Sequence, residues 1–168
     1  MKLAEDFKRK SRNLVIGLVG LFLIALVADK LIGWTALCGA VCHWATGLVL
    51  LIIGFGVASI GGRQLTLYGR TSENLPRGTT DRMVTQGIFS YVRHPMFSSF
   101  MCILFGVGFL LNSKGFTFIS APLGSLYLIW FAYFKEEKEA VEKFGDAYKD
   151  YKQHVPPFFP YKRPFYQK

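Results

Sequence analysis

The sequence lacks the short motifs that mark common nucleotide-binding and zinc-dependent soluble enzymes. It contains no P-loop, no GxGxxG fingerprint and no HExxH pair. The phosphate cradles and zinc sites that these motifs build are therefore not predicted. The nearest glycine pattern, Gly54-Phe55-Gly56, lies inside an apolar run, where small residues usually serve helix packing.

Cysteine is scarce, with three residues in the chain. Cys38 and Cys42 are one helical turn apart and His43 adjoins them. Two thiols and a neighbouring imidazole on a different helical face make a poor tetrahedron. We predict no metal site here and expect these cysteines to be small packing residues.

Charge is missing from four long stretches, although the chain of 168 residues carries a formal net charge of +9. The uncharged stretches are residues 14–28, 31–62, 96–111 and 115–134. A membrane-spanning helix needs about 20 mostly apolar residues, and long polar side chains at its ends can reach the interface. We predict an all-α polytopic membrane bundle with about four transmembrane helices, roughly 12–32, 38–60, 95–111 and 115–134.

The basic residues are distributed unevenly between the connections. The N-terminal tail has five, the segment between the second and third spans has five, and the region after the fourth span has eight. The other two connections have one each, Lys30 and Lys114. Because positive residues mark the cytoplasmic side, we predict that both termini are cytoplasmic and that nucleic acid is not a partner. Residues 1–168 are expected to form a single integral-membrane domain.

The first apolar run could instead be the core of a signal peptide, since basic residues precede it. A cut after Ala28 would place Leu26 at the −3 position, which is a poor cleavage site. We therefore expect an uncleaved helix.

An amphipathic helix is predicted after the fourth span. Apolar residues recur there near the helical period: Ala140, Val141, Phe144, Ala147, Tyr148, Tyr151 and Val155. The following "VPPFFP" is expected to stop this cytoplasmic helix.

Charged residues at the two cytoplasmic ends of the last helical hairpin are the candidates for chemistry. Arg93 and His94 precede Pro95, which suits the first turn of a helix. Taken alone, they are better explained as an interfacial pair at a membrane surface. The short turn at residues 112–114 makes the third and fourth spans neighbours, so Glu136 and Glu137 should lie at the same depth as Arg93 and His94. Such a cluster would suit a small molecule with an ammonium and a carboxylate, against aromatic faces.

The same residues resemble the isoprenylcysteine carboxyl methyltransferase family and its phospholipid methyltransferase relatives. The resemblance rests on Val84-Thr85-Gln86-Gly87-Ile88-Phe89, Arg93-His94-Pro95-Met96-Phe97, Glu136-Glu137, and Phe144-Gly145 with Tyr148 and Tyr151. It covers about residues 80–157, which would be the catalytic region.

This resemblance implies an S-adenosylmethionine-dependent methyltransferase acting on a lipidic or lipid-linked acceptor in the bilayer, either isoprenylcysteine carboxylate-like or phospholipid-amine-like. The residues it implies for the cofactor are Arg82, Met83, Val84, Phe89, His94, Pro95, Met96, Phe97, Glu136 and Glu137. Glu136 would take the cofactor's amino group. Arg93 and His94 are the candidate catalytic residues, and a base is needed only if the acceptor must lose a proton.

The sequence departs from the family pattern in two ways. Phe89 and Phe97 stand where the family usually has tyrosines, and Ala132 stands where the prenylcysteine branch has an arginine that helps to hold the substrate. The second departure weakens the prenylcysteine assignment specifically. Two other classes remain open: a membrane reductase that uses a nicotinamide cofactor, and a non-catalytic small membrane protein.

Overall fold

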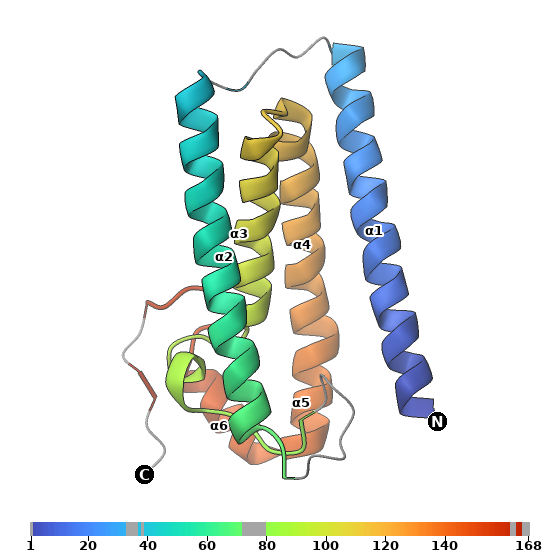
Figure 1. Ribbon diagram of the computed structural model, residues 1–168. Helices are drawn as coiled ribbons and strands as arrows, with labels where there is room; N and C mark the ends of the chain where they lie inside the picture. Colours follow the sequence, from blue (N-terminus) through green and yellow to red (C-terminus); the bar gives the residue numbers. More distant parts are fainter. Residues whose placement is uncertain (1, 33–36, 38, 72–79, 162–163, 166–168) are drawn as a thin grey trace. The chain divides into compact units, whose positions relative to one another are not determined.

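The computed structural model describes residues 2–32, 37, 39–71, 80–161 and 164–165, and all the regular structure in them is helical (Figure 1). The prediction of an all-α chain is therefore confirmed for these residues. The elements are α1 (Lys2–Ile32), α2 (Ala40–Tyr68), the 3₁₀ turn η1 (Gly87–Ser90), α3 (Pro95–Leu110), the π turn η2 (Phe116–Ser120), α4 (Ala121–Phe131), the π turn η3 (Ala132–Glu136), α5 (Glu137–Phe144) and α6 (Asp146–His154).

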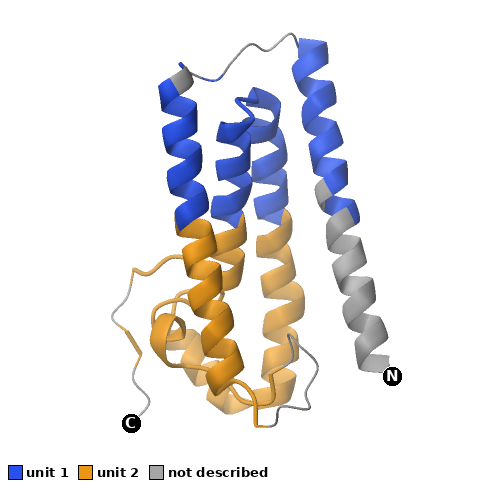
Figure 2. Cartoon of the chain, viewed as in Figure 1, with its two compact units in different colours: residues 1–52, 101–126 blue, residues 53–100, 127–168 orange. Residues whose placement is uncertain are grey.

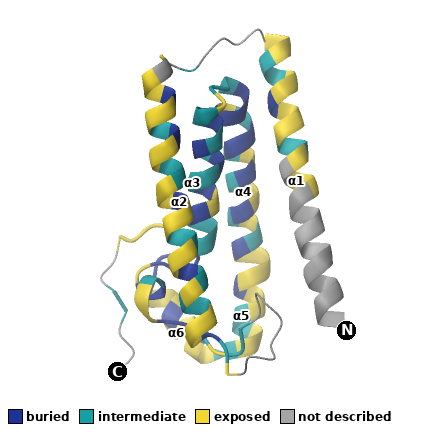
Figure 3. Ribbon diagram, viewed as in Figure 1, coloured by how far each residue is buried: buried dark blue, intermediate teal, exposed yellow. Residues whose placement is uncertain are grey.

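Two helical stretches in the described part are long and apolar enough to cross a membrane, Val41–Tyr68 and Phe116–Phe144. A shorter apolar helix covers Pro95–Leu110. Many large apolar side chains on α1, α2 and α4 are exposed, as the burial colouring shows (Figure 3). Exposed apolar surface of this extent is typical of helices that face hydrocarbon, and it indicates an integral-membrane protein.

The chain divides into two compact units, whose boundary cuts across α2, α3 and α4 (Figure 2). Unit 1 comprises Met1–Ile52 and Met101–Leu126, and unit 2 comprises Ile53–Phe100 and Tyr127–Lys168. All the predicted site residues belong to unit 2.

Within unit 1, Asp29 of α1 fixes the turn that follows α3. Its carboxylate accepts the backbone N–H of Gly115 at 2.7 Å and the hydroxyl of Ser113. The Ser113 hydroxyl oxygen in turn accepts the N–H of Phe116, so both groups satisfy donors at a helix start. A Cβ at Gly115 would lie 2.8 Å from the carbonyl oxygen of Ala25, which shows how closely α1 approaches this turn.

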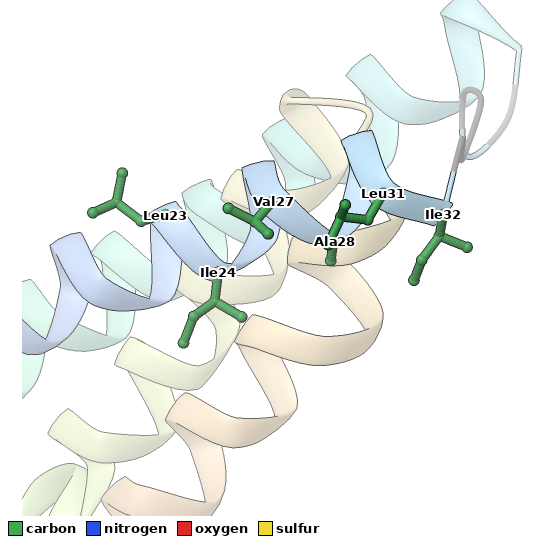
Figure 4. Close-up of a pocket in the computed structure, with 6 residues that line it drawn as sticks. All are labelled: Leu23, Ile24, Val27, Ala28, Leu31 and Ile32. Atoms are coloured by element: carbon green, nitrogen blue, oxygen red, sulfur yellow. The ribbon is translucent and has the colours of Figure 1, made fainter.

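An apolar hollow of about 470 Å³ runs along α1 (Figure 4). Its lining comes entirely from that helix: Leu23, Ile24, Val27, Ala28, Leu31 and Ile32. It offers almost no polar surface to a ligand, which suits contact with lipid rather than recognition of a small molecule.

In unit 2, α2 continues to Tyr68, eight residues beyond its predicted end at residue 60. The extension places Gln64 where its side-chain oxygen accepts the N–H of Ile88 at 2.9 Å. The chain can make this close approach because Gly87 has a positive φ of 61° and no side chain. Part of the predicted connection between the second and third spans is thus helix, and residues 72–79 lie outside the described part.

The predicted single amphipathic helix is two helices. Gly145, with φ of 59°, separates α5 from α6, and α5 continues directly from η3. Only glycine adopts this conformation without strain, so the backbone breaks there and the two amphipathic segments change direction.

We predict that Gly87→Ala destabilises the protein. A Cβ there would lie 2.3 Å from Gln64 Nε2, and the backbone would be strained as well. A non-glycine residue in this conformation costs about 1–3 kcal/mol, equivalent to a loss of roughly 3–10 °C in the midpoint of thermal unfolding. Gly62→Ala, where no atom lies within 4 Å of the new Cβ, is the control and should not lower the midpoint. Equal midpoints for both variants in detergent would contradict the prediction.

Candidate functional site

Arg93 and His94 lie in the short segment between η1 and α3, and both are buried. Their backbone N–H groups donate to the carbonyl oxygens of Pro156 and Pro157, each at 2.9 Å. Residues 155–158, which we call the C-terminal strap, thus satisfy two donors that lie just before the first turn of α3. The fully buried Pro95 starts that helix, as predicted.

Glu136 and Glu137 lie where the π turn η3 passes into α5. Consecutive residues of a helix point about 100° apart, so the two side chains face different surroundings. The Glu137 side chain is 3% exposed and that of Glu136 is 46% exposed. π turns are frequent at functional sites, and this one sets which of the two carboxylates faces inward.

The Glu137 carboxylate is the centre of a buried ion-pair network. Its Oε1 lies 3.0 Å from Arg93 Nη1 and 3.4 Å from His94 Nε2, and its Oε2 lies 2.5 Å from Lys152 Nζ on α6. An isolated carboxylate would be very costly to bury, whereas one surrounded by cations is stable. The network therefore brings together Arg93, His94 and Glu137 as the sequence predicts.

His94 also contacts the second carboxylate. Its Nδ1 lies 3.3 Å from Glu136 Oε2. Both ring nitrogens can donate only when the imidazole is protonated. Burial opposes that charge, but the hydrogen bonds and negative charges of Glu136 and Glu137 outweigh it and raise the pKa of His94. The geometry favours the imidazolium, so His94 is poorly suited to accept a further proton.

Two aromatic rings flank the His94 imidazole. The Phe97 ring centroid is 5.7 Å away and that of Phe158 is 5.8 Å away. Phe97 also meets Phe131 of α4 edge-on at 6.0 Å. These rings surround a charged imidazole with apolar surface and fix its orientation.

Three of the residues that the resemblance assigns to the cofactor, Arg82, Met83 and Val84, line a separate polar pocket. The remaining lining residues of this pocket of about 260 Å³ are Leu67, Tyr68, Thr85 and Gln86. This volume is slightly below the range of about 300–1,000 Å³ common for ligand pockets. The pocket does not include Glu136 or His94, so the described structure does not join all the predicted residues in one cavity.

The other predicted residues pack rather than line an open cavity. Phe89 is buried, and Met96 lies against α2, where its sulfur would be 3.2 Å from a Cβ at Gly61. Among the predicted residues, Glu136 and Arg82 are the most accessible.

Sequence reasoning missed Lys152 and Phe158. Lys152 is one of many lysines on an amphipathic segment, and no local pattern distinguishes it. Phe158 belongs to the segment that was expected only to stop a helix. The Tyr151 hydroxyl was also missed; it donates to the carbonyl oxygen of Phe89 at 2.6 Å, and burial raises its pKa.

The donors and acceptors of this cluster fit a small zwitterionic or cationic ligand. Glu136 offers a half-exposed carboxylate to an ammonium. Arg93 Nε is a buried donor without a hydrogen-bond acceptor among the described residues, and a ligand carboxylate would suit it. The part of the chain that the structure describes contains no cluster of side chains suited to a metal ion.

The helical fold agrees with comparisons to known proteins. The family model described as phospholipid methyltransferase matches residues 41–147, more than half of the chain. The chain therefore belongs to the phospholipid methyltransferase family. Lys152 and the C-terminal strap lie beyond the matched residues.

Two individual proteins are similar to the chain. Protein-S-isoprenylcysteine O-methyltransferase from Schizosaccharomyces pombe is 38% identical over 81 residues, which are 46% of this chain and 33% of that protein. The solved structure of the eukaryotic intramembrane Ras methyltransferase ICMT (isoprenylcysteine carboxyl methyltransferase) matches 93% of this chain and 55% of its own, with a TM-score of 0.55 and 19% identity. The second likeness concerns the fold alone. The matches span about a third of the first protein and about half of the second.

We predict that the two adjacent glutamates differ sharply in their effect on stability. Glu137→Gln leaves Arg93 buried without its counterion and His94 with Glu136 alone, and it should cost about 3 kcal/mol, or roughly 6–12 °C in the unfolding midpoint. Glu136→Gln removes a half-exposed pair and should cost less than about 1 kcal/mol. Thermal unfolding of both variants in detergent measures the difference. Similar losses would show that Glu137 is not the centre of the network.

The raised pKa of His94 predicts that stability depends on pH. Because the folded protein binds this proton more tightly than the unfolded chain, the contribution is fully present below the ordinary value of about 6.5. It is lost as the pH rises through the folded pKa. Unfolding measured from about pH 6 to about pH 9 should show this decline. His94→Asn should flatten it, and an equal decline in that variant would assign the effect elsewhere.

Proposed function

We propose that the chain is an integral-membrane methyltransferase that uses S-adenosylmethionine and acts on a lipidic or lipid-linked acceptor. The observation that carries the proposal is the cluster of Arg93, His94, Glu136 and Glu137, in which one carboxylate is buried and paired and the other is half exposed. Membership of the phospholipid methyltransferase family and the likeness to the two isoprenylcysteine methyltransferases support it.

Different residues would hold different groups of the methyl donor. Glu136 would hold the ammonium group, because it is the accessible carboxylate and its pairing with His94 leaves it half exposed. Arg93, already fixed by Glu137, would face a carboxylate group. Arg82, Met83 and Val84 would contribute the polar pocket beside α2 as a further part of the binding surface.

When bound, S-adenosylmethionine would supply a methyl group on a positively charged sulfur. The protein's task in such a displacement is to align the acceptor with that group and to keep water away. Phe97 and Phe131, with ring centroids 6.0 Å apart, provide apolar surface next to His94 for this purpose. Their faces also tolerate a nearby cation.

The charge state of His94 favours an acceptor that is already deprotonated. Its imidazole holds a proton between two carboxylates, so it would not readily take one from an amine or thiol. A carboxylate acceptor needs no base. At the position where the prenylcysteine branch has an arginine, Ala132 is fully buried, so we propose a lipid-linked carboxylate that is held differently from prenylcysteine.

We further propose that the chain acts as one membrane domain with four spans and cytoplasmic termini, on the basis of its basic-residue distribution. Cysteines introduced at Lys30 and Lys114 should react with an impermeant reagent from outside, whereas a cysteine at Lys152 should not. Outside labelling at Lys152 would contradict this orientation.

The test of the donor site is Glu136→Gln. This variant loses a charge-assisted hydrogen bond of about 1.5 kcal/mol, which is the lower end of the usual range because Glu136 is half exposed. S-adenosylmethionine binding should therefore weaken about tenfold. Glu139→Gln, at an exposed position in the first turn of α5, is the matched control and should bind like the unaltered protein. Calorimetry on folded, detergent-purified protein measures both. Equal affinities in the two variants would remove Glu136 from the donor site.

The same preparation separates the alternative classes. Binding of NADPH in place of S-adenosylmethionine would favour a membrane reductase, and binding of neither would favour a non-catalytic protein. Transfer of a labelled methyl group to lipid-linked carboxylates, compared with phospholipid amines and small soluble thiols, then identifies the acceptor class. Equal methylation of a soluble thiol with and without micelles would overturn the lipidic acceptor.

A further inference from the structure

The C-terminal strap contacts the site through both backbone and side chain. Pro156 and Pro157 accept the N–H groups of Arg93 and His94. The Ser98 hydroxyl, one turn into α3, lies 2.7 Å from the carbonyl oxygen of Phe158 and 3.2 Å from that of His94. Two strap residues are therefore bonded to the two candidate catalytic residues, and a third is bonded to the first turn of α3.

Phe158 is the strap residue whose side chain reaches the site. Its ring lies 5.8 Å from that of His94 at 33° and meets Tyr133 edge-on at 5.9 Å. Phe158 is 8% exposed, whereas the next residue, Phe159, is 67% exposed. These two adjacent phenylalanines thus have opposite surroundings, and Phe158 is the one whose ring contacts His94.

The Phe158 ring is placed to control how His94 meets the carboxylates. The imidazole must present Nδ1 to Glu136 and Nε2 to Glu137 at the same time, at 3.3 and 3.4 Å. Both distances exceed the usual range of about 2.7–2.9 Å for charge-assisted bonds, so a small rotation of the ring would break one of these contacts. Phe97, from the helix that His94 precedes, and Phe158, from the strap, are the rings that restrict such a rotation.

We propose that Phe158 is a positioning residue of the donor site, which holds the His94 ring so that it bridges Glu136 and Glu137. The inference rests on the proposed function, because it assigns Glu136 to the donor. The strap is then part of the site rather than a stop after the last helix. Phe158 itself touches neither donor nor acceptor in this proposal.

The first measurement needs no ligand. The chain has three histidines, and NMR of the labelled imidazoles gives each titration, with His94→Asn identifying the His94 signal. In Phe158→Ala, the imidazole can rotate away from Glu136 and Glu137, whose combined effect on its pKa outweighs the opposing effect of burial. Its titration midpoint should fall toward the ordinary value, by about 0.5 to 1 in pH for one aromatic pair. Phe159→Ala is the matched control and should leave the midpoint unchanged, while Phe158→Tyr retains the ring and should restore it.

The second measurement is the affinity for S-adenosylhomocysteine, a stable analogue of the donor, by calorimetry on the full chain. Phe158→Ala should weaken binding about three- to tenfold, and Phe159→Ala should not. If Phe158→Ala does not fold, Phe158→Leu, which keeps the apolar volume, is used in its place in both measurements. An unchanged midpoint in a folded variant, or a lowered midpoint with unchanged affinity, would overturn the proposal. Failure of the unaltered protein to bind the analogue would instead overturn the donor site, and the ligand-free titration would still decide whether Phe158 positions His94.

Discussion

One buried carboxylate, that of Glu137, determines how the segment before α3 and the helices α5 and α6 are arranged in unit 2. Three cations from two separate segments lie within 3.4 Å of it: Arg93 and His94 before α3, and Lys152 on α6. A charge buried this deeply costs several kcal/mol unless it is paired, so the segments are stable only where they meet it. The attraction of opposite charges thus holds together elements that are more than forty residues apart in the chain.

Because the Glu137 carboxylate is already paired with these three cations, Glu136 has a different role. Glu136 shares His94 with it but remains half exposed, so it keeps the capacity to meet a ligand. The π turn η3 places the two residues on either side of this boundary. A rigid inner carboxylate and an accessible outer one are what a site needs if it is to hold a ligand without rearranging the protein around it.

The sequence predicted the helices and the two halves of the cluster, but not the details that depend on distant contacts. Long uncharged runs indicate helices because a bilayer leaves few other choices, yet the end of α2 depends on Gln64 meeting Ile88, which no local pattern reveals. The hairpin argument brought Arg93 and Glu137 together correctly. Lys152 could not be found in this way, since it lies fifteen residues from its partner and beyond the break at Gly145.

The strap shows why a stop signal can also be part of a site. Val155 is extended, as a residue before proline prefers, and the two prolines that follow have no N–H to donate. Their carbonyl groups remain available, and the N–H groups of Arg93 and His94, which precede the first turn of α3, lie opposite them. The proline carbonyl groups therefore accept hydrogen bonds from two N–H groups that have no partner within α3. The residues that end α6 thus also stabilise the start of α3. The same match brings Phe158 to His94, so the strap contributes one aromatic ring to the surroundings of the cluster.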